Sequence, residues 1–146
     1  MQFQSILVIC TGNICRSPLA EGLFRRDAPR LNVSSAGIGA VVGGTMPDPA
    51  ARIAEREGLA LETHRGRQVD EQIIRDHDLV VVMEEGQRQW LTTRFPQSRG
   101  RVFLLSHWRG GEDIADPYQR SEEFFEHIYA ELEPCVADWV QRLVPG

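Results

Sequence analysis

Short apolar runs alternate with segments of helical periodicity along the chain. Apolar runs at residues 6–9, 79–83 and 102–105 have the length of strands, and residues 33–36 predict a further short strand. Residues 79–83 are apolar without interruption and are bounded by charged residues. Such a run is typical of a strand that is buried on both faces in a parallel sheet. The pattern therefore predicts four strands with their sheet in the interior.

Helices are predicted in the segments between these strands. Ser17 before Pro18 and Asp48 before Pro49 are typical of helix starts, because a capping side chain accepts a backbone hydrogen bond and proline needs none at the first helical position. Proline or glycine follows several of these segments and is expected to end the helix. The expected ranges are 18–27, 48–57, 70–76 and 84–95.

A last helix is expected to begin near Ser121. Its apolar residues recur at every third or fourth position, so one face is apolar, while Pro134 predicts a kink or an interruption. Because strands alternate with helices, the fold class is α/β: a four-stranded parallel sheet with helices on both faces, in a single domain of residues 1–146. The carboxyl ends of such strands are the usual place for a ligand site.

Charge and composition limit the classes of partner. The chain has 16 Lys and Arg against 21 Asp and Glu, with a formal net charge of −5. This balance disfavours nucleic acid and anionic membranes as main partners. No stretch approaches the ~20 apolar residues of a membrane span, and the first apolar run is shorter than that of a secretion signal. Three cysteines are an odd number for a secreted disulfide framework, so we expect a cytoplasmic protein with reduced thiols.

The most informative segment joins the first strand to the first helix, and we call residues 10–17 the anion loop. A loop in this position directs several backbone N–H groups and the positive end of a helix dipole to one point, which favours a bound anion. These surroundings favour the thiolate of Cys10, and the Arg16 guanidinium has donors that match phosphate oxygens. The residues expected to bind phosphate are Thr11, Gly12, Asn13, Ile14, Cys15, Arg16 and Ser17.

The pattern Cys-x4-Cys-Arg-Ser after a first strand resembles the signature of the low-molecular-weight protein tyrosine phosphatases. A second hallmark, Asp-Pro-Tyr, is present at residues 116–118 in the long loop after the fourth strand. The resemblance implies a phosphatase that needs no metal and no cofactor. Cys10 would attack phosphorus, Arg16 would hold the phosphate oxygens, and Asp116 would protonate the departing oxygen and then activate water. Inorganic phosphate and vanadate are the expected inhibitors.

The resemblance also implies supporting roles around the anion loop. Ser17 would donate a hydrogen bond to the nucleophilic sulfur, and Asn13 would take a left-handed backbone conformation that asparagine tolerates. Ser35 and His64 fall where family members have a hydrogen-bond network that braces this loop. Cys15 would form a reversible disulfide with Cys10 under oxidation.

Two departures from eukaryotic members indicate the bacterial subgroup. The loop after the second strand has small aliphatic residues, with Val41 and Val42 where an aromatic wall is common. Tyr118 is followed by glutamine instead of a second tyrosine. The expected substrate cleft is therefore formed by Val41, Val42, Trp108 and Tyr118. The subgroup implies a tyrosine autokinase of capsule or exopolysaccharide export as the phosphotyrosine partner.

Other interpretations remain open from the sequence. An arsenate reductase on the same fold needs further cysteines after the third strand, and residues 84–100 contain none. A non-catalytic phosphotyrosine-binding module would have no use for both Cys10 and Asp116. Within the site, Glu112 and Asp113 are competing acids. Arg67 is assigned no direct role, and Cys135 is expected in the core.

Overall fold

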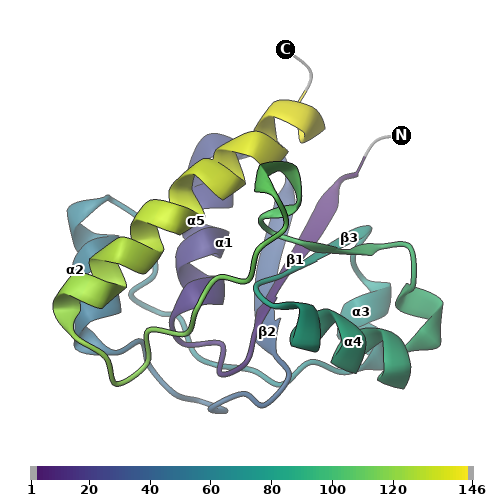
Figure 1. Cartoon of the computed structure of the whole chain (residues 1–146), viewed down its shortest axis with the longest axis horizontal. Coiled ribbons are helices and arrows are strands. Elements are labelled where there is room, and N and C mark those ends of the chain that lie inside the picture. The colour runs from purple at the N-terminus through teal and green to yellow at the C-terminus, as the bar shows by residue number, and fades with distance from the viewer. Residues whose placement is uncertain (1–2, 145–146) are drawn as a thin grey trace.

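A parallel sheet lies at the centre of the protein (Figure 1), and it has four strands. The computed structural model describes residues 3–144, so the two residues at each end of the expected domain lie outside the described part. The strand order is β2-β1-β3-β4, and all three pairings are parallel. The strands are β1 (Ser5–Cys10), β2 (Asn32–Gly37), β3 (Leu79–Val82) and β4 (Val102–Leu104). The predicted α/β class, with four parallel strands, is confirmed.

Helices cover both faces of this sheet. Alternate residues of β1 point to opposite faces, so Ile6 and Val8 pack in one apolar cluster and Leu7 and Ile9 in the other. The first cluster lies beneath α1 (Arg16–Asp27), α2 (Asp48–Arg56) and α5 (Glu122–Leu143). The second lies beneath α3 (Glu71–Arg75) and α4 (Glu85–Arg94), on the other side of the sheet in Figure 1. Two short 3-10 helices, η1 (Pro96–Ser98) and η2 (His107–Arg109), flank β4.

The helix starts agree with the sequence only in part. Asp70 and Ser121 cap α3 and α5 as expected, each accepting a hydrogen bond from the backbone N–H three residues later. The N-cap expected at Ser17 is wrong: α1 begins at Arg16, and the Ser17 side chain turns to Cys10. Asp48 is likewise the first residue of α2 and not its cap. At Ser17, the capping hydrogen bond expected within the helix is replaced by a contact with the Cys10 sulfur.

The proline inside the last helix does not interrupt it. Helix α5 runs without a break from Glu122 to Leu143 and includes Pro134. Its apolar face packs mainly on α1, so burial along the helix outweighs the one backbone hydrogen bond that proline removes. Within residues 3–144, no helix combines the length and the apolar character that crossing a membrane requires.

Candidate active site

The anion loop leaves the sheet at the carboxyl end of β1 and enters α1 directly. Cys10 is the last residue of β1, and Arg16 is the first of α1. The Cys10 side chain is only 2% exposed, at the floor of a small cavity of about 190 Å³. Residues from three loops line it: Cys10, Thr11, Gly12, Ile14, Cys15, Arg16, Gly39, Val41, Asp116 and Tyr118. The fold thus brings the three expected catalytic residues to one cavity.

Two groups of the anion loop contact the Cys10 sulfur. The backbone N–H of Asn13 donates to Sγ at 3.2 Å, and Ser17 Oγ lies 3.0 Å from it. Asn13 has φ 59°, the left-handed conformation that the sequence predicted, and this bends the loop so that its N–H faces the sulfur. The Ser17 hydroxyl reaches the sulfur from the first turn of α1.

The direction of the Ser17 hydrogen bond follows from its neighbours. The backbone N–H of Arg67 donates to Asn13 Oδ1 at 2.9 Å, so the Asn13 amide nitrogen must face the other way. That nitrogen donates to Ser17 Oγ at 2.7 Å and to Ser35 Oγ at 3.0 Å. Because Ser17 accepts from Asn13, its own hydroxyl hydrogen is left for the sulfur. A donor at this position stabilises a thiolate.

A buried glutamate anchors the far end of this chain of hydrogen bonds. Ser35 Oγ donates to Glu21 Oε1, and the other oxygen of this carboxylate lies 2.6 Å from Arg25 Nη2. Glu21 is buried in α1, among the apolar residues that pack on the sheet. Glu21 was not predicted from the sequence, although a lone acid on an apolar helix face, four residues after Ser17, is a usable signal.

His64 and Arg67 hold the anion loop from the polar connection after α2. His64 Nε2 lies 2.7 Å from the carbonyl oxygen of Asn13, and a carbonyl only accepts, so Nε2 carries the hydrogen. The expectation that Arg67 has no direct role is wrong. Besides its backbone contact with Asn13, its guanidinium Nε donates to the Ser35 carbonyl oxygen at 2.8 Å. The structure thus has the network that the sequence predicted at Ser35 and His64, with Arg67 and Glu21 added.

Arg16 is held in place from two sides. Its side chain is 1% exposed, and Nη1 donates to the Ile114 carbonyl oxygen at 2.7 Å and to the Glu84 carboxylate. Nη2 lies 3.7 Å from Asp116 Oδ2. Arg16 Nε is buried and has no hydrogen-bond partner within the described residues, which leaves a donor for an oxygen of a bound anion. The Glu84 carboxylate therefore holds the Arg16 guanidinium in its position beside the cavity.

The first turn of α4, which follows β3 after two residues, contributes a side chain that was not predicted from the sequence. Gln87 Oε1 accepts from the backbone N–H groups of Met83 and Glu84, and Gln87 Nε2 donates to Thr11 Oγ1 at 3.1 Å. The only sequence signal was position, since this helix start also follows a strand at the carboxyl edge of the sheet.

Asp116 stands at the mouth of the cavity. Its side chain is 48% exposed, and Oδ1 accepts from the Tyr118 backbone N–H at 3.0 Å, which fixes the carboxyl orientation across Pro117. The competing acid Asp113 is engaged elsewhere, because its Oδ1 accepts from the Glu85 backbone N–H at the start of α4. Asp116 is the carboxyl among these two that lines the cavity.

The second cysteine of the loop has a strongly altered environment. Burial, reinforced by the nearby Cys10 and Asp116, raises the pKa of Cys15 to about 12. Burial raises the pKa of Cys135 to about 11, and this residue lies in the core as expected. All three cysteines are free thiols. A Cys10–Cys15 disulfide therefore remains a prediction.

The predicted substrate cleft is correct in position for two of its four residues. Val41 and Tyr118 line the cavity mouth, whereas Val42 is 73% exposed and is absent from the lining. The prediction for Trp108 is wrong. Its ring packs 5.5 Å from that of Trp139 and lies beneath Arg142 of α5. The reason is that η2 turns back onto α5, which the sequence of the long loop does not reveal.

No cluster of three or more His, Cys, Asp and Glu side chains within residues 3–144 has the arrangement of a metal site. The chemistry available at the cavity is that of a thiol, an arginine and a carboxyl group that line one space. This set suits transfer of a phosphoryl group to sulfur, with a proton for the departing oxygen.

Comparison with known proteins gives consistent matches over nearly the whole chain. The family model described as low molecular weight phosphotyrosine protein phosphatase matches residues 5–145. The chain is 43% identical to the low molecular weight protein-tyrosine-phosphatase Wzb of Salmonella typhimurium over 97% of this chain and 95% of the relative. It is 40% identical to Etp of Escherichia coli strain K12, a protein of the same description, over 98% and 97% of the two chains.

A solved structure agrees with this sequence similarity. The crystal structure of the tyrosine phosphatase Wzb from Escherichia coli K30 in complex with sulphate superposes with a TM-score of 0.93 at 43% identity. The match covers 97% of this chain and 99% of that one.

Proposed function

This chain belongs to the low molecular weight phosphotyrosine protein phosphatases and is a protein tyrosine phosphatase, and from that premise we propose that it acts through a covalent phosphocysteine on Cys10. The observation that carries the proposal is the surroundings of one sulfur. Cys10 Sγ receives a hydrogen bond from the Asn13 backbone and lies next to the Ser17 hydroxyl, at the floor of a cavity lined by Arg16 and Asp116.

In the first step, the Cys10 thiolate attacks phosphorus. The sulfur–phosphorus bond forms as the bond to the tyrosine oxygen breaks, and Asp116 gives its proton to that oxygen. Arg16 and the anion-loop amides hold the equatorial oxygens, where negative charge is concentrated. The preset orientation of Arg16 by Glu84 and Ile114 supports this role, because the guanidinium does not have to reorganise during the reaction.

In the second step, water attacks the phosphocysteine and releases inorganic phosphate. Asp116, now ionised, accepts a proton from this water, and Cys10 leaves as the thiolate. The exposure of Asp116 at the cavity mouth supports both roles, since water reaches the carboxyl group from outside. Ser17 and Asn13 stabilise the sulfur anion as it departs.

The substrate is proposed to be phosphotyrosine in a protein. The cavity is narrow, and its mouth has the exposed Val41 and Tyr118 for contacts with an aryl ring. By resemblance to the bacterial subgroup, we take a tyrosine autokinase of capsule or exopolysaccharide export as the partner. The cytoplasm suits the reaction because a free thiol is more stable in a reducing compartment.

Hydrolysis assays in the presence of a metal chelator test the proposal. Para-nitrophenyl phosphate and a phosphotyrosine peptide should be hydrolysed, phosphoserine and phosphothreonine peptides much more slowly, and vanadate should inhibit. Cys10→Ser should abolish turnover, and rapid quenching of the native enzyme should trap one phosphate per chain on Cys10. Normal turnover by Cys10→Ser, or phosphate trapped on another residue, would refute the phosphocysteine mechanism.

A further inference from the structure

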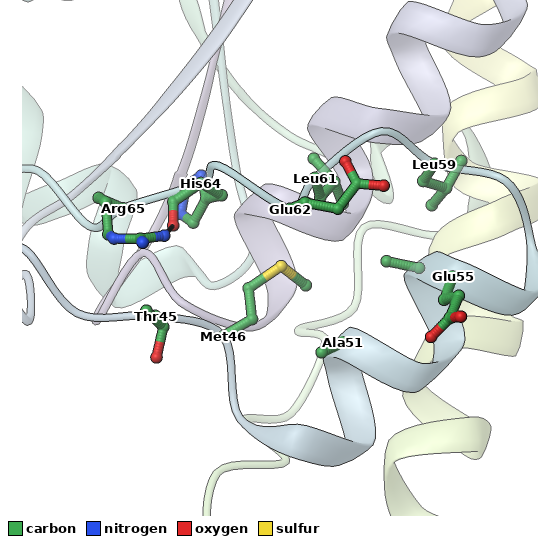
Figure 2. A pocket seen from close by; sticks show the side chains of 10 residues that line it. Thr45, Met46, Ala51, Glu55, Leu59, Leu61, Glu62, His64 and Arg65 are labelled. Carbon is green, nitrogen blue, oxygen red and sulfur yellow. Dashed lines mark hydrogen bonds between the residues drawn. The ribbon is translucent and has the colours of Figure 1, made fainter.

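A second, larger cavity lies behind the anion loop, away from the catalytic one. It has a volume of about 440 Å³, which is within the range of small-molecule sites, and Figure 2 shows its side chains. Helix α2 forms one wall, and the segments before and after this helix form the others. Its lining residues are Thr45, Met46, Ala51, Ala54, Glu55, Leu59, Leu61, Glu62, His64 and Arg65.

Residues that line this cavity are connected to the anion loop by hydrogen bonds. His64 lines it and also holds the Asn13 carbonyl oxygen at 2.7 Å. The next residue after the lining segment, Gly66, exchanges two backbone hydrogen bonds of 2.9 Å with Gly43 and Gly44. The same loop carries Val41, which bonds to the anion loop through its N–H and lines the catalytic cavity. A molecule in this cavity would therefore touch groups that are one hydrogen bond from the anion loop.

The polarity of the lining identifies the kind of molecule that fits. Met46, Leu59 and Leu61 are buried and form an apolar floor. Glu55 and Glu62 are exposed at its edge, and neither carboxylate has an ion-pair or hydrogen-bond partner in the described part of the chain. In Figure 2 these two carboxylates lie toward one end of the cavity.

The one arginine of the lining does not neutralise these acids. Arg65 lies at the other end in Figure 2, and its Nη1 donates to the His64 carbonyl oxygen. An apolar floor beside two unpaired carboxylates complements a cation on an apolar body, because each part of such a ligand finds its match.

We propose that this cavity is an effector site for a small organic cation, an aromatic or branched aliphatic amine, and that His64 transmits its binding to the anion loop. The ammonium group would lie between Glu55 and Glu62, with the apolar body over Met46. Because the space already exists, the ligand packs against His64 without displacing it. It thereby restrains the ring that holds Asn13, and phosphate analogues should bind more tightly to the restrained loop.

Three ligands of matched shape test the charge assignment. Tryptamine, tryptophol and indole-3-propionate carry the same indole with a cationic, a neutral and an anionic end. Binding is measured by isothermal titration calorimetry and by two-dimensional NMR on the enzyme saturated with vanadate, so that the catalytic cavity is occupied. Tryptamine should bind at least about fivefold more tightly than the other two, with shifts at His64, Met46 and Asn13. Equal or tighter binding of the neutral or anionic ligand would refute the proposed cation site.

Variants locate the site. Glu55→Gln with Glu62→Gln should weaken tryptamine binding roughly five- to tenfold, since two partly exposed ion pairs are lost. The matched control Glu71→Gln with Glu131→Gln removes two exposed acids from α3 and α5 and should change nothing. Ala51→Trp fills the cavity from the exposed side of α2 and should abolish binding. Native activity on para-nitrophenyl phosphate is expected in all three, and unchanged tryptamine affinity in the first would contradict the site.

The link to the anion loop has its own measurement. Saturating tryptamine should tighten vanadate binding roughly fivefold, and vanadate should tighten tryptamine binding by the same factor. Competition between the two would place tryptamine in the catalytic cavity, and independence would refute the role of His64. These binding assays need no turnover, so their failure is distinct from failure of the phosphatase mechanism.

Discussion

Replacing Ser17 by alanine tests the direction of the hydrogen bonds around the nucleophile. Because Asn13 donates to Ser17 Oγ, the Ser17 hydrogen points to the Cys10 sulfur at 3.0 Å. Ser17→Ala removes that donor and leaves only the Asn13 backbone N–H at 3.2 Å. A hydrogen bond to a charged acceptor contributes about 1.5–3 kcal/mol, and we take about 1.5–2 kcal/mol because the acceptor is sulfur and one donor remains. This corresponds to a roughly 10- to 30-fold lower ratio of thiolate to thiol at a fixed pH.

The rate of alkylation by iodoacetamide measures this thiolate directly, since only the thiolate reacts. Intact-mass spectrometry should find a single modification, on Cys10, because burial raises the pKa of Cys15 to about 12 and that of Cys135 to about 11. In buffer acidic enough that the thiol form predominates, Ser17→Ala should slow this alkylation and lower kcat/KM for para-nitrophenyl phosphate by similar factors.

A matched control separates this effect from a general loss of stability. Ser98 is also fully buried, and its hydroxyl donates to the Phe95 carbonyl oxygen at 2.7 Å, remote from the anion loop. Ser98→Ala should therefore leave the alkylation rate unchanged. If Ser17→Ala reacts with iodoacetamide as fast as the native enzyme, the Ser17 hydroxyl does not stabilise the sulfur anion, and the reasoning from hydrogen-bond direction is wrong.

Three further predictions concern the acid, the arginine and alkaline pH. Asp116→Asn should slow esters with poor leaving groups more than those with good ones, in a series of aryl phosphates, and an equal loss across the series would indicate another acid. Glu84→Gln should weaken vanadate binding roughly five- to tenfold, because Arg16 loses a charged partner that is itself partly exposed, and unchanged inhibition would exclude this positioning role. Burial raises the pKa of both Cys15 and Tyr129 to about 12, from 9.0 and 10.0. The folded state therefore binds more protons than the unfolded state above about pH 9, so the free energy of unfolding should fall from about pH 9 upward in urea titrations, and a flat profile would contradict it.

The strands and their burial follow from the sequence for a simple physical reason. Residues 79–83 form an uninterrupted apolar run, and such a run satisfies its backbone groups and its side chains together only inside a parallel sheet. The four strands, the helices between them and the caps at Asp70 and Ser121 are local features, so local patterns predict them. The continuity of α5 through Pro134 is not local, because packing on α1 decides it.

The nucleophile, the arginine and the loop that holds them are likewise determined by the sequence itself. Residues 10–17 contain them consecutively, so the loop that joins β1 to α1 carries both groups to the same end of the sheet. Asn13 has the left-handed conformation that the family resemblance implied. The Asp-Pro-Tyr motif identified Asp116 as the candidate acid. The position of Asp116 at the cavity, however, depends on how the long loop folds back.

What only the tertiary structure decided is how the loop is supported. The residues that support it are far apart in the chain: Glu21, Arg67 and Glu84. The residues next to them in the sequence do not indicate their hydrogen-bond partners. Trp108 is the opposite case: its place in the long loop after β4 predicted a substrate contact, but its side chain packs on α5 and not at the cavity mouth. A hydrogen bond or a ring contact across the fold depends on distances set by all the intervening elements. The sequence therefore determines which groups react, and the packed fold determines which groups orient them.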